Sequence, residues 1–212
     1  MLGCAFEQVG QEGEGVLLND ISGAFADNDE MQVASIVKGK LKYSSYYYLT
    51  EDGGMAMEGD GWYDEEFNAV GDVDRIPLGS AFWFISENGK AKSVTVSGEV
   101  RSTPFTHTLK DKKSMICSAF PVAFNPNENC TWTGFEDNDE IQVAQINKST
   151  GKLKYTSYYY LTEDGGMAME GTGWYDEEFS LVTKPITVVG QGFWLVLNST
   201  NGRGFVEASP LK

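Results

Sequence analysis

The residues that could carry catalytic chemistry are few. The chain has one histidine, His107, so a Ser–His–Asp or Cys–His arrangement could be built only once, although most of the sequence occurs twice. One histidine offers no pair for a transition-metal site, and the sequence contains no phosphate-binding or dinucleotide-binding glycine motif. Two carboxylates about 5–9 Å apart could hydrolyse a glycosidic bond, but nothing selects a pair among 31 acids. We therefore predict a protein that is not an enzyme, and rank a glycoside-active enzyme third among the candidate functions.

Acidic clusters recur at matched positions and suggest a metal site. Each copy contains the run Asp-Asn-Asp, which gives six candidate calcium ligands: Asp27, Asn28, Asp29, Asp137, Asn138 and Asp139. Calcium prefers several oxygen ligands from carboxylates, amides and carbonyls. The spacing is not that of an EF-hand loop, and Asp and Asn side chains that cap turns explain the same residues. Calcium is the one candidate cofactor, and otherwise none is expected.

Aromatic residues form a second set of candidates, for a ligand or for a protein interface. They come from two tyrosine-rich segments and the Gly-Trp-Tyr-Asp motifs that follow: Tyr46, Tyr48, Trp62, Tyr63, Tyr158, Tyr160, Trp174 and Tyr175. Successive residues of a strand point to opposite faces, so Tyr46 and Tyr48 should share one face and Tyr47 should take the other. One face should belong to the core, and core packing is the competing explanation for these residues.

A tandem duplication positions these candidates. Residues 45–67 (SYYYLTEDGGMAMEGDGWYDEEF) return as residues 157–179 with one difference, Asp60 against Thr172. All ten tyrosines fall in matched sets of five, and only Trp132 lacks a counterpart among the tryptophans. The landmarks recur at an offset of 112 residues, close to the usual size of an independent domain. We predict two homologous domains, residues 1–100 and residues 101–212.

Both units have an all-β pattern. The 24 glycines separate short apolar or alternating runs, and no segment keeps a helical period over three turns. The predicted strands of the first unit include residues 1–6, 30–37 and 41–49, with a hairpin turn at 38–40, and residues 76–85 are predicted to be a turn that leads into a central apolar strand. Six or seven strands per unit fit a β-sandwich or a small β-barrel.

The two units differ before their first shared strand. Residues 105–109 (FTHTL) look like a strand that precedes Met115, and nothing before Met1 matches it. Either the chain was trimmed or processed there, or the first domain lacks a strand, or residues 101–114 are a linker between the domains. A missing strand would leave an open sheet edge, which invites pairing with another chain.

The charge balance argues against several partners. The net charge is −15, and residues 1–100 carry 18 acids against 6 bases. Nucleic acids and anionic membrane surfaces select basic faces, so neither is expected as a partner. No apolar run approaches the ~20 residues that span a bilayer, and no signal peptide is recognised. Cys117 and Cys130 could bridge a loop, but with Cys4 the count is odd, so cysteine usage does not decide the redox compartment.

Three motifs occur in the same order in each copy: a tyrosine-rich strand, Gly-Trp-Tyr-Asp, and a glycine turn before Phe-Trp. They occupy residues 46–48, 61–64 and 79–83, and then 158–160, 173–176 and 190–194. This order resembles tandem all-β modules of large secreted bacterial surface proteins of unassigned function. The first copy departs from it, with Ser80-Ala81 where the second has Gln191-Gly192. The resemblance implies an extracellular or cell-surface location and supplies no catalytic residues.

Taken together, these observations predict a non-enzymatic extracellular structural protein, such as a fibre or surface-layer subunit. Its expected partners are copies of itself or other surface proteins. The expected mechanism is completion of the open edge of the first domain by a strand from a neighbour. The alternative is a carbohydrate-binding or adhesion module with glycans as ligands, in which Trp62 and Trp174 would be required for binding.

Overall fold

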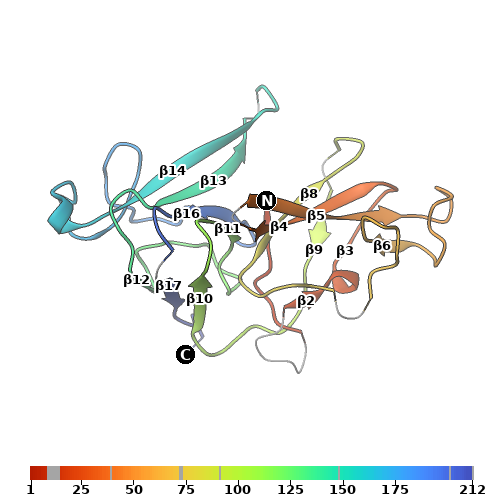
Figure 1. The fold of residues 1–212 in the computed structure, drawn as a ribbon, viewed down its shortest axis with the longest axis horizontal. Helices are drawn as coiled ribbons and strands as arrows, with labels where there is room; N and C mark the ends of the chain where they lie inside the picture. Colours follow the sequence, from red (N-terminus) through yellow and green to blue (C-terminus); the bar gives the residue numbers. More distant parts are fainter. Residues whose placement is uncertain are drawn as a thin grey trace.

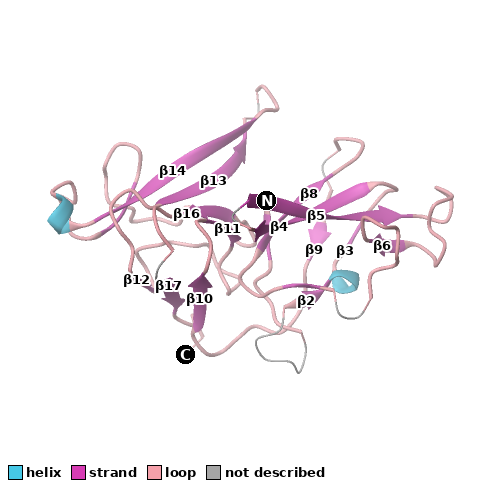
Figure 2. Cartoon of the chain, in the orientation of Figure 1, coloured by secondary structure: helices cyan, strands magenta, loops and turns pink. Residues whose placement is uncertain are grey.

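The computed structural model describes residues 1–8, 15–38, 40–71, 74–90, 92–147, 149–200 and 202–211. The described chain is all-β, as predicted, and its sheets are antiparallel (Figures 1 and 2). Its two helical segments are single 3-10 turns, η1 (Leu18–Asp20) and η2 (Glu163–Gly165). The glycine of the predicted turn at 38–40 lies outside the described residues.

Each copy of the repeat builds a five-stranded sheet with the same strand order. The first sheet runs β1 (Leu2–Gly3), β8 (Ala81–Ile85), β4 (Asp29–Val37), β5 (Lys40–Leu49) and β6 (Gly61–Tyr63). The second runs β11 (Lys113–Ile116), β16 (Phe193–Val196), β13 (Glu140–Ile146), β14 (Leu153–Leu161) and β15 (Gly173–Tyr175). The register matches too, because Tyr48 pairs with Trp62 as Tyr160 pairs with Trp174. Strands β4 and β5 coincide with the alternation in the sequence, whereas the predicted strand at 1–6 is regular over two residues only.

Smaller sheets lie beside the large ones. In the first half β2 (Val16–Leu17) pairs with β7 (Arg75–Ile76), and β3 (Ser22–Gly23) pairs with β9 (Val94–Thr95). In the second half β17 (Arg203–Glu207) lies between β12 (Cys130–Thr133) and β10 (Phe105–Leu109). The strand predicted at 105–109 is therefore present, and it belongs to a sheet of the second half rather than to a bare linker.

Each half has its own apolar core between its large and small sheets, which gives a sandwich-like arrangement. In the first half the buried set includes Met31, Trp62 and Phe82 from the large sheet with Val16 and Ile76 from a small one. In the second half it includes Ile141, Trp174, Phe193, Leu109 and Phe205. Large aromatic residues dominate both cores because they bury the most apolar surface per residue.

The two halves interlock through symmetry-related contacts near the N-terminus (Figure 1). The Gly3 N–H donates to the Gly190 carbonyl at 2.9 Å, and the Cys117 N–H donates to the Gly79 carbonyl at the same distance. Gly3 and Cys117 are equivalent in the duplication, as are Gly79 and Gly190. A further apolar cluster spans the boundary and contains Ala81, Met115, Cys117 and Trp194. Division into two domains at residue 100 stays a prediction.

Candidate functional site

Half of the aromatic candidates are packing residues. Four of them are at most 3 % exposed: Trp62, Tyr63, Trp174 and Tyr175. The Tyr63 hydroxyl donates to the Gly59 carbonyl at 2.7 Å and accepts the Glu58 N–H at 3.1 Å, and Tyr175 repeats both bonds in the second half. Tyr63 and Tyr175 therefore hold the loop before their own strand. Together with the fully buried Trp174, they cannot form the exposed binding face considered from the sequence.

The tyrosines of β5 and β14 also face their cores. Tyr46, Tyr48 and Tyr158 are partly buried against the core clusters, and Tyr160 belongs to one. The predicted shared face of Tyr46 and Tyr48 is therefore correct, and it is the core-facing side. Burial, together with neighbouring acids, raises the pKa of Tyr46, Tyr158 and Tyr160. Their hydroxyls stay neutral at ordinary pH, as packing residues require.

The Asp-Asn-Asp runs cap turns and anchor buried ion pairs. Asp29 is fully buried, and its carboxylate accepts the N–H groups of Ala26 at 2.8 Å and Glu87 at 3.2 Å. The same carboxylate pairs with the ammonium group of Lys92. The second half repeats this arrangement, since Asp139 accepts two backbone N–H groups and pairs with Arg203.

These contacts do not fit the calcium site considered from the sequence. A calcium ion at Asp29 or Asp139 would lie beside a buried cation and would compete with the N–H donors. The other residues of the first Asp-Asn-Asp run also stabilise turns. Asp27 accepts hydrogen bonds from the N–H and the hydroxyl of Thr50, and Asn28 adopts a left-handed turn conformation with φ of 63°. Within the described ranges, no group of three His, Cys, Asp or Glu side chains is placed to hold a metal.

His107 lies in a buried polar cluster with Glu207 and Ser118. Its Nε2 is 3.3 Å from Glu207 Oε2, and the other carboxylate oxygen accepts the Ser118 hydroxyl. The carboxylate thus separates the serine from the histidine, so the histidine cannot take the serine proton as in a catalytic triad. Burial lowers the pKa of His107, while Glu207 partly opposes this shift. The cluster is closed to solvent and fixes β10 against β17.

All three cysteines are free thiols, so the structure contains no Cys117–Cys130 bridge.

An apolar groove beside β9 is the first candidate site, and we call it the β9 groove. It has a volume of about 200 Å³, and its walls include Ala5, Phe6, Val94, Val96, Val189 and Gly190. Strand β9 pairs with β3 on one edge, and within the described residues no strand lies along its other edge. The equivalent strand β17 carries β10 on that edge (Figure 1).

The walls of the β9 groove match the contacts of β10 in the second half. There, Phe105 packs on Leu78, Ala119 and Phe120, whose equivalents are Val189, Ala5 and Phe6 of the groove. A Cβ atom on Gly79 would lie 2.6 Å from the His107 ring and 3.0 Å from the Phe105 ring, whereas the equivalent Gly190 has nothing within 4 Å. In the part of the chain that the structure describes, the groove is thus the unfilled counterpart of the place that β10 fills.

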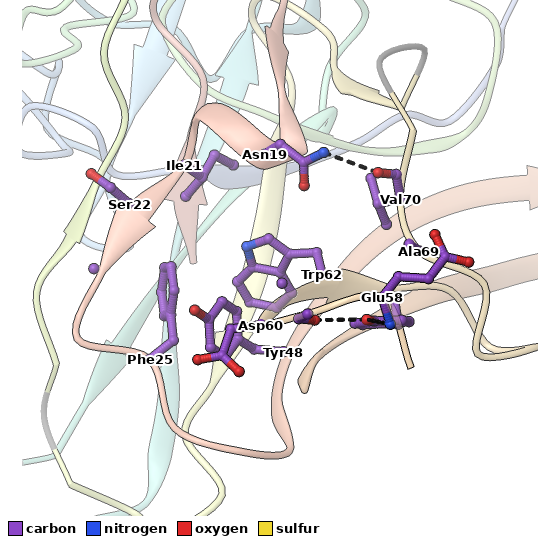
Figure 3. Close-up of a pocket in the computed structure, with 14 residues that line it drawn as sticks. Asn19, Ile21, Ser22, Phe25, Tyr48, Glu58, Asp60, Trp62, Ala69 and Val70 are labelled. Atoms are coloured by element: carbon purple, nitrogen blue, oxygen red, sulfur yellow. Dashed lines mark hydrogen bonds between the residues drawn. The ribbon is translucent and has the colours of Figure 1, made fainter. Parts of the chain in front are cut away.

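A second cavity lies beside Trp62, and we call it the Trp62 pocket. Its volume is about 450 Å³, and its lining includes Asn19, Phe25, Tyr48, Glu58, Asp60 and Trp62. Figure 3 shows Trp62 at its centre, with Phe25 and Tyr48 to one side and Val70 and Glu58 to the other. Asn19 holds the wall in place by donating to the Val70 carbonyl at 2.9 Å. The sequence predicts Trp62 and Tyr48 as site residues but does not single out Phe25, Asn19 or Asp60 for this role, although Asp60 differs between the copies.

The comparisons with known proteins found no relative from which a function could be inferred. No protein-family model, curated protein or solved structure matches the chain. Among the described residues, no helix is long and apolar enough to cross a membrane. Function is therefore argued from the structure of the chain itself.

Proposed function

We propose that the protein is a non-enzymatic structural subunit that assembles with neighbouring copies, each inserting an extended segment into the β9 groove of the next. The observation that carries the proposal is that no described strand lies beside β9 at the position where the duplicated half holds β10. An unpaired strand edge above an apolar groove favours strand addition, in which main-chain hydrogen bonds supply affinity and side-chain pockets supply specificity.

The groove selects a particular kind of segment. In the second half the centre of β10 is polar, because His107 meets Glu207 and Ser118. The equivalents of the latter two in the first half are Val96 and Cys4, which offer no comparable partner for a histidine. A segment that follows the alternation of β10 but carries an apolar residue in place of His107 should therefore bind best, since it leaves no polar group unpaired.

The extracellular or cell-surface setting belongs to the same proposal. It is supported by the resemblance of the motif order to that of secreted surface modules and by an acidic balance that favours solubility over binding to nucleic acids. A fibre or surface layer is the form of assembly that a head-to-tail strand contact would produce, because the contact is heterologous and does not close on itself.

The proposal is tested with a peptide of residues 103–111 and a second peptide carrying His107→Leu. Fluorescence anisotropy of labelled peptide on the intact chain should show saturable binding, tighter for the leucine peptide. Val96→Lys, which places a charge in the groove, should abolish binding, whereas Ile146→Asp at an exposed position on β13 should not. Thermal melts of both variants establish that they fold.

Self-assembly is measured on the same samples. Light scattering over a concentration series and negative-stain microscopy should show oligomers that Val96→Lys and excess leucine peptide both reduce. A folded chain that stays monomeric throughout and binds neither peptide would contradict the proposal.

A further inference from the structure

The two long hairpins are the basic parts of an acidic chain. Residues 31–50 and 141–162 contain six of the 16 lysine and arginine residues and no aspartate or glutamate. The segments that follow them, residues 51–74 and 163–183, contain nine and six acids and no base. Positive and negative charge are therefore separated along the chain in the same way in both copies.

Near its end, each hairpin carries the run Lys-Leu-Lys-Tyr, at residues 40–43 and residues 152–155, and we call these runs the hairpin tips. All four lysines are exposed, and no ion pair joins any of them to another described residue. The apolar members of the tips are between 36 % and 49 % exposed: Leu41, Tyr43, Leu153 and Tyr155. The tips thus present both apolar surface and unpaired positive charge.

Each tip also has an open strand edge. Strand β6 pairs with β5 over residues 47–49 only, and β15 pairs with β14 over residues 159–161. In the described chain no strand lies along that edge of either tip, and Figure 1 shows β13 and β14 reaching away from the smaller sheets. Successive side chains point to opposite faces, so a partner at the edge can reach the lysines and the apolar residues together.

The lysines select the partner. Lysine on an open edge opposes pairing with a similar strand, so one tip does not suit another tip. The same charge attracts an acidic partner, and this chain supplies one, since its net charge is −15. That net charge also opposes the approach of nucleic acids and anionic membranes. Charge complementarity therefore favours an acidic surface of a second copy.

The acidic surface that fits is the turn Asp-Glu-Glu-Phe, at residues 64–67 and residues 176–179. Phe67 and Phe179 are each 51 % exposed, and the carboxylates of Glu66 and Glu178 have no partner among the described residues. Each turn thus presents an aromatic ring beside free negative charge, which complements the lysines and apolar side chains of a tip.

The shape of the turn is set by its aspartate rather than by its phenylalanine. Asp64 Oδ1 accepts the N–H groups of Glu66 at 2.9 Å and Asn68 at 2.8 Å, and Asp176 repeats both contacts. Phe67 and Phe179 adopt left-handed conformations with φ of 63° and 61°, which are uncommon for bulky residues. Asparagine would suit this backbone better, so the ring can be replaced without loss of the turn.

Tip and turn lie along the same edge of each hairpin. The Ser45 N–H, two residues after the first tip ends, donates to Glu65 Oε1 at 2.8 Å, and Ser157 donates to Glu177 at 3.1 Å. We call a hairpin with its turn an arm. Two arms in antiparallel orientation place the tip of each on the turn of the other, which is the self-complementary arrangement of a two-fold contact.

We propose that each arm binds an arm of a second copy, with the hairpin tip of one contacting the Asp-Glu-Glu-Phe turn of the other in both directions. This inference rests on the proposed self-assembly but uses a surface separate from the β9 groove. Because each chain has two arms, the contact links copies into an open series.

Charge exchange between tip and turn tests the contact. All chains carry Val96→Lys, so that strand addition at the β9 groove is absent. The tip variant carries Lys40→Glu, Lys42→Glu, Lys152→Glu and Lys154→Glu, and the turn variant carries Glu66→Lys and Glu178→Lys. Sedimentation velocity over a concentration series should show that the Val96→Lys chain associates and that each variant alone associates about 10-fold more weakly or less. An equimolar mixture of the two variants should associate again, because the reversed charges then face each other.

The matched control reverses four exposed lysines elsewhere and gives the same net charge as the tip variant: Lys90→Glu, Lys110→Glu, Lys112→Glu and Lys184→Glu. It should associate like the Val96→Lys chain. Raising sodium chloride from about 0.05 to about 0.5 M should weaken association of that chain, because salt screens exposed charges.

The aromatic part of the contact is tested with Phe67→Asn and Phe179→Asn together. Association should weaken about 10-fold or more, since aromatic residues are common anchors of interfaces. The melting temperature should not fall, because asparagine adopts the left-handed conformation more readily than phenylalanine. A lower melting temperature with unchanged association would instead identify the rings as packing residues and would overturn their role.

A Val96→Lys chain that stays monomeric, or a mixture of the two variants that does not associate, would overturn the proposal. Equal association of the tip variant and its charge-matched control would do the same. So would binding to vesicles of phosphatidylserine and phosphatidylcholine that depends on the tip lysines without association between copies. The leucine peptide should bind the β9 groove equally in the original chain and in a tip variant without Val96→Lys, which distinguishes failure of the arm contact from failure of strand addition.

Discussion

At the residue scale, most buried polar groups of this protein form hydrogen bonds and ion pairs with other parts of the chain, and these contacts stabilise the fold. The buried acids Asp29 and Asp139 each collect backbone N–H donors and one cation. Such groups are satisfied because an unpaired charge in a protein interior is costly. Acidic runs that resemble metal ligands in the sequence therefore act as connectors between turns and strands. The exceptions among the described residues are four buried nitrogen atoms without a hydrogen-bond partner: Trp62 Nε1, Trp174 Nε1, Asn125 Nδ2 and Arg203 Nε.

His107 provides a prediction about pH. Its pKa is lowered by burial, so the folded chain binds the proton less readily than the unfolded chain, whose histidine has a pKa of about 6.5. The associated stability should be complete above about pH 6.5 and should decrease as the pH falls from there toward the folded pKa. Because the chain has one histidine, its ring proton gives a single NMR titration that measures the folded value directly.

The control for this prediction is the same titration in denaturant, which should return the ordinary value. His107→Gln should remove the part of the stability change that occurs between about pH 7 and the folded pKa. A folded pKa at or above that of the denatured chain would contradict the prediction.

At the element scale, short strands are held in place by side chains from outside their own sheet. Strand β17 begins at Arg203, whose guanidinium reaches Asp139 in the turn before β13 and also Glu136 at 2.8 Å. Strand β9 follows Lys92, which reaches Asp29 in the same way. The ion pair therefore joins the small sheet to the large sheet in both halves, which is needed because strands of two to five residues bury little surface by themselves.

Removal of the cation tests this role. Arg203→Met should leave the buried Asp139 carboxylate without a counter-charge and should lower the free energy of unfolding by about 3–5 kcal/mol, the usual cost of breaking a buried pair. Chemical denaturation measures this change. Lys92→Met is the matched change in the first half and should also destabilise, while Lys154→Met at an exposed position on β14 should stay within about 0.5 kcal/mol of the original. Equal stabilities for Arg203→Met and Lys154→Met would contradict the role.

At the scale of the whole molecule, the two copies are joined by an interface that has no room for a side chain at Gly192. A Cβ atom on Gly192 would lie 2.3 Å from the Ala81 Cβ in the other half. Ala81 and Trp194 belong to the apolar cluster that spans the boundary. The contact explains why the second copy has Gly-Phe-Trp where the first has Ala-Phe-Trp, since two side chains cannot occupy the same space.

We expect Gly192→Leu to uncouple the halves. The original chain should unfold in one cooperative calorimetric transition, because the shared cluster makes the stability of each half depend on the other. The leucine should force the boundary apart and produce two transitions, or one at a clearly lower temperature. Gly61→Ala is the control, because a Cβ atom at Gly61 meets nothing within 4 Å. Identical melting profiles for Gly192→Leu and the control would show that the interface is not tightly packed.

The sequence by itself determined the class and repetition of the fold. Period-two alternation and regularly spaced glycines require strands and turns wherever the chain folds, so the all-β class and strands β4, β5 and β10 could be predicted. Duplicated segments fold alike because they carry the same local preferences and the same core residues.

Only the tertiary structure decided which side chains are buried and which distant segments lie together. Alternation assigns Tyr46 and Tyr48 to one face, but it cannot say which face packs against the core. Asp29 and Lys92, 63 residues apart, form a pair that no local pattern encodes. The β9 groove lies where β10 packs in the other half and where no described strand packs in the first, and such a groove forms only after distant segments have packed against each other.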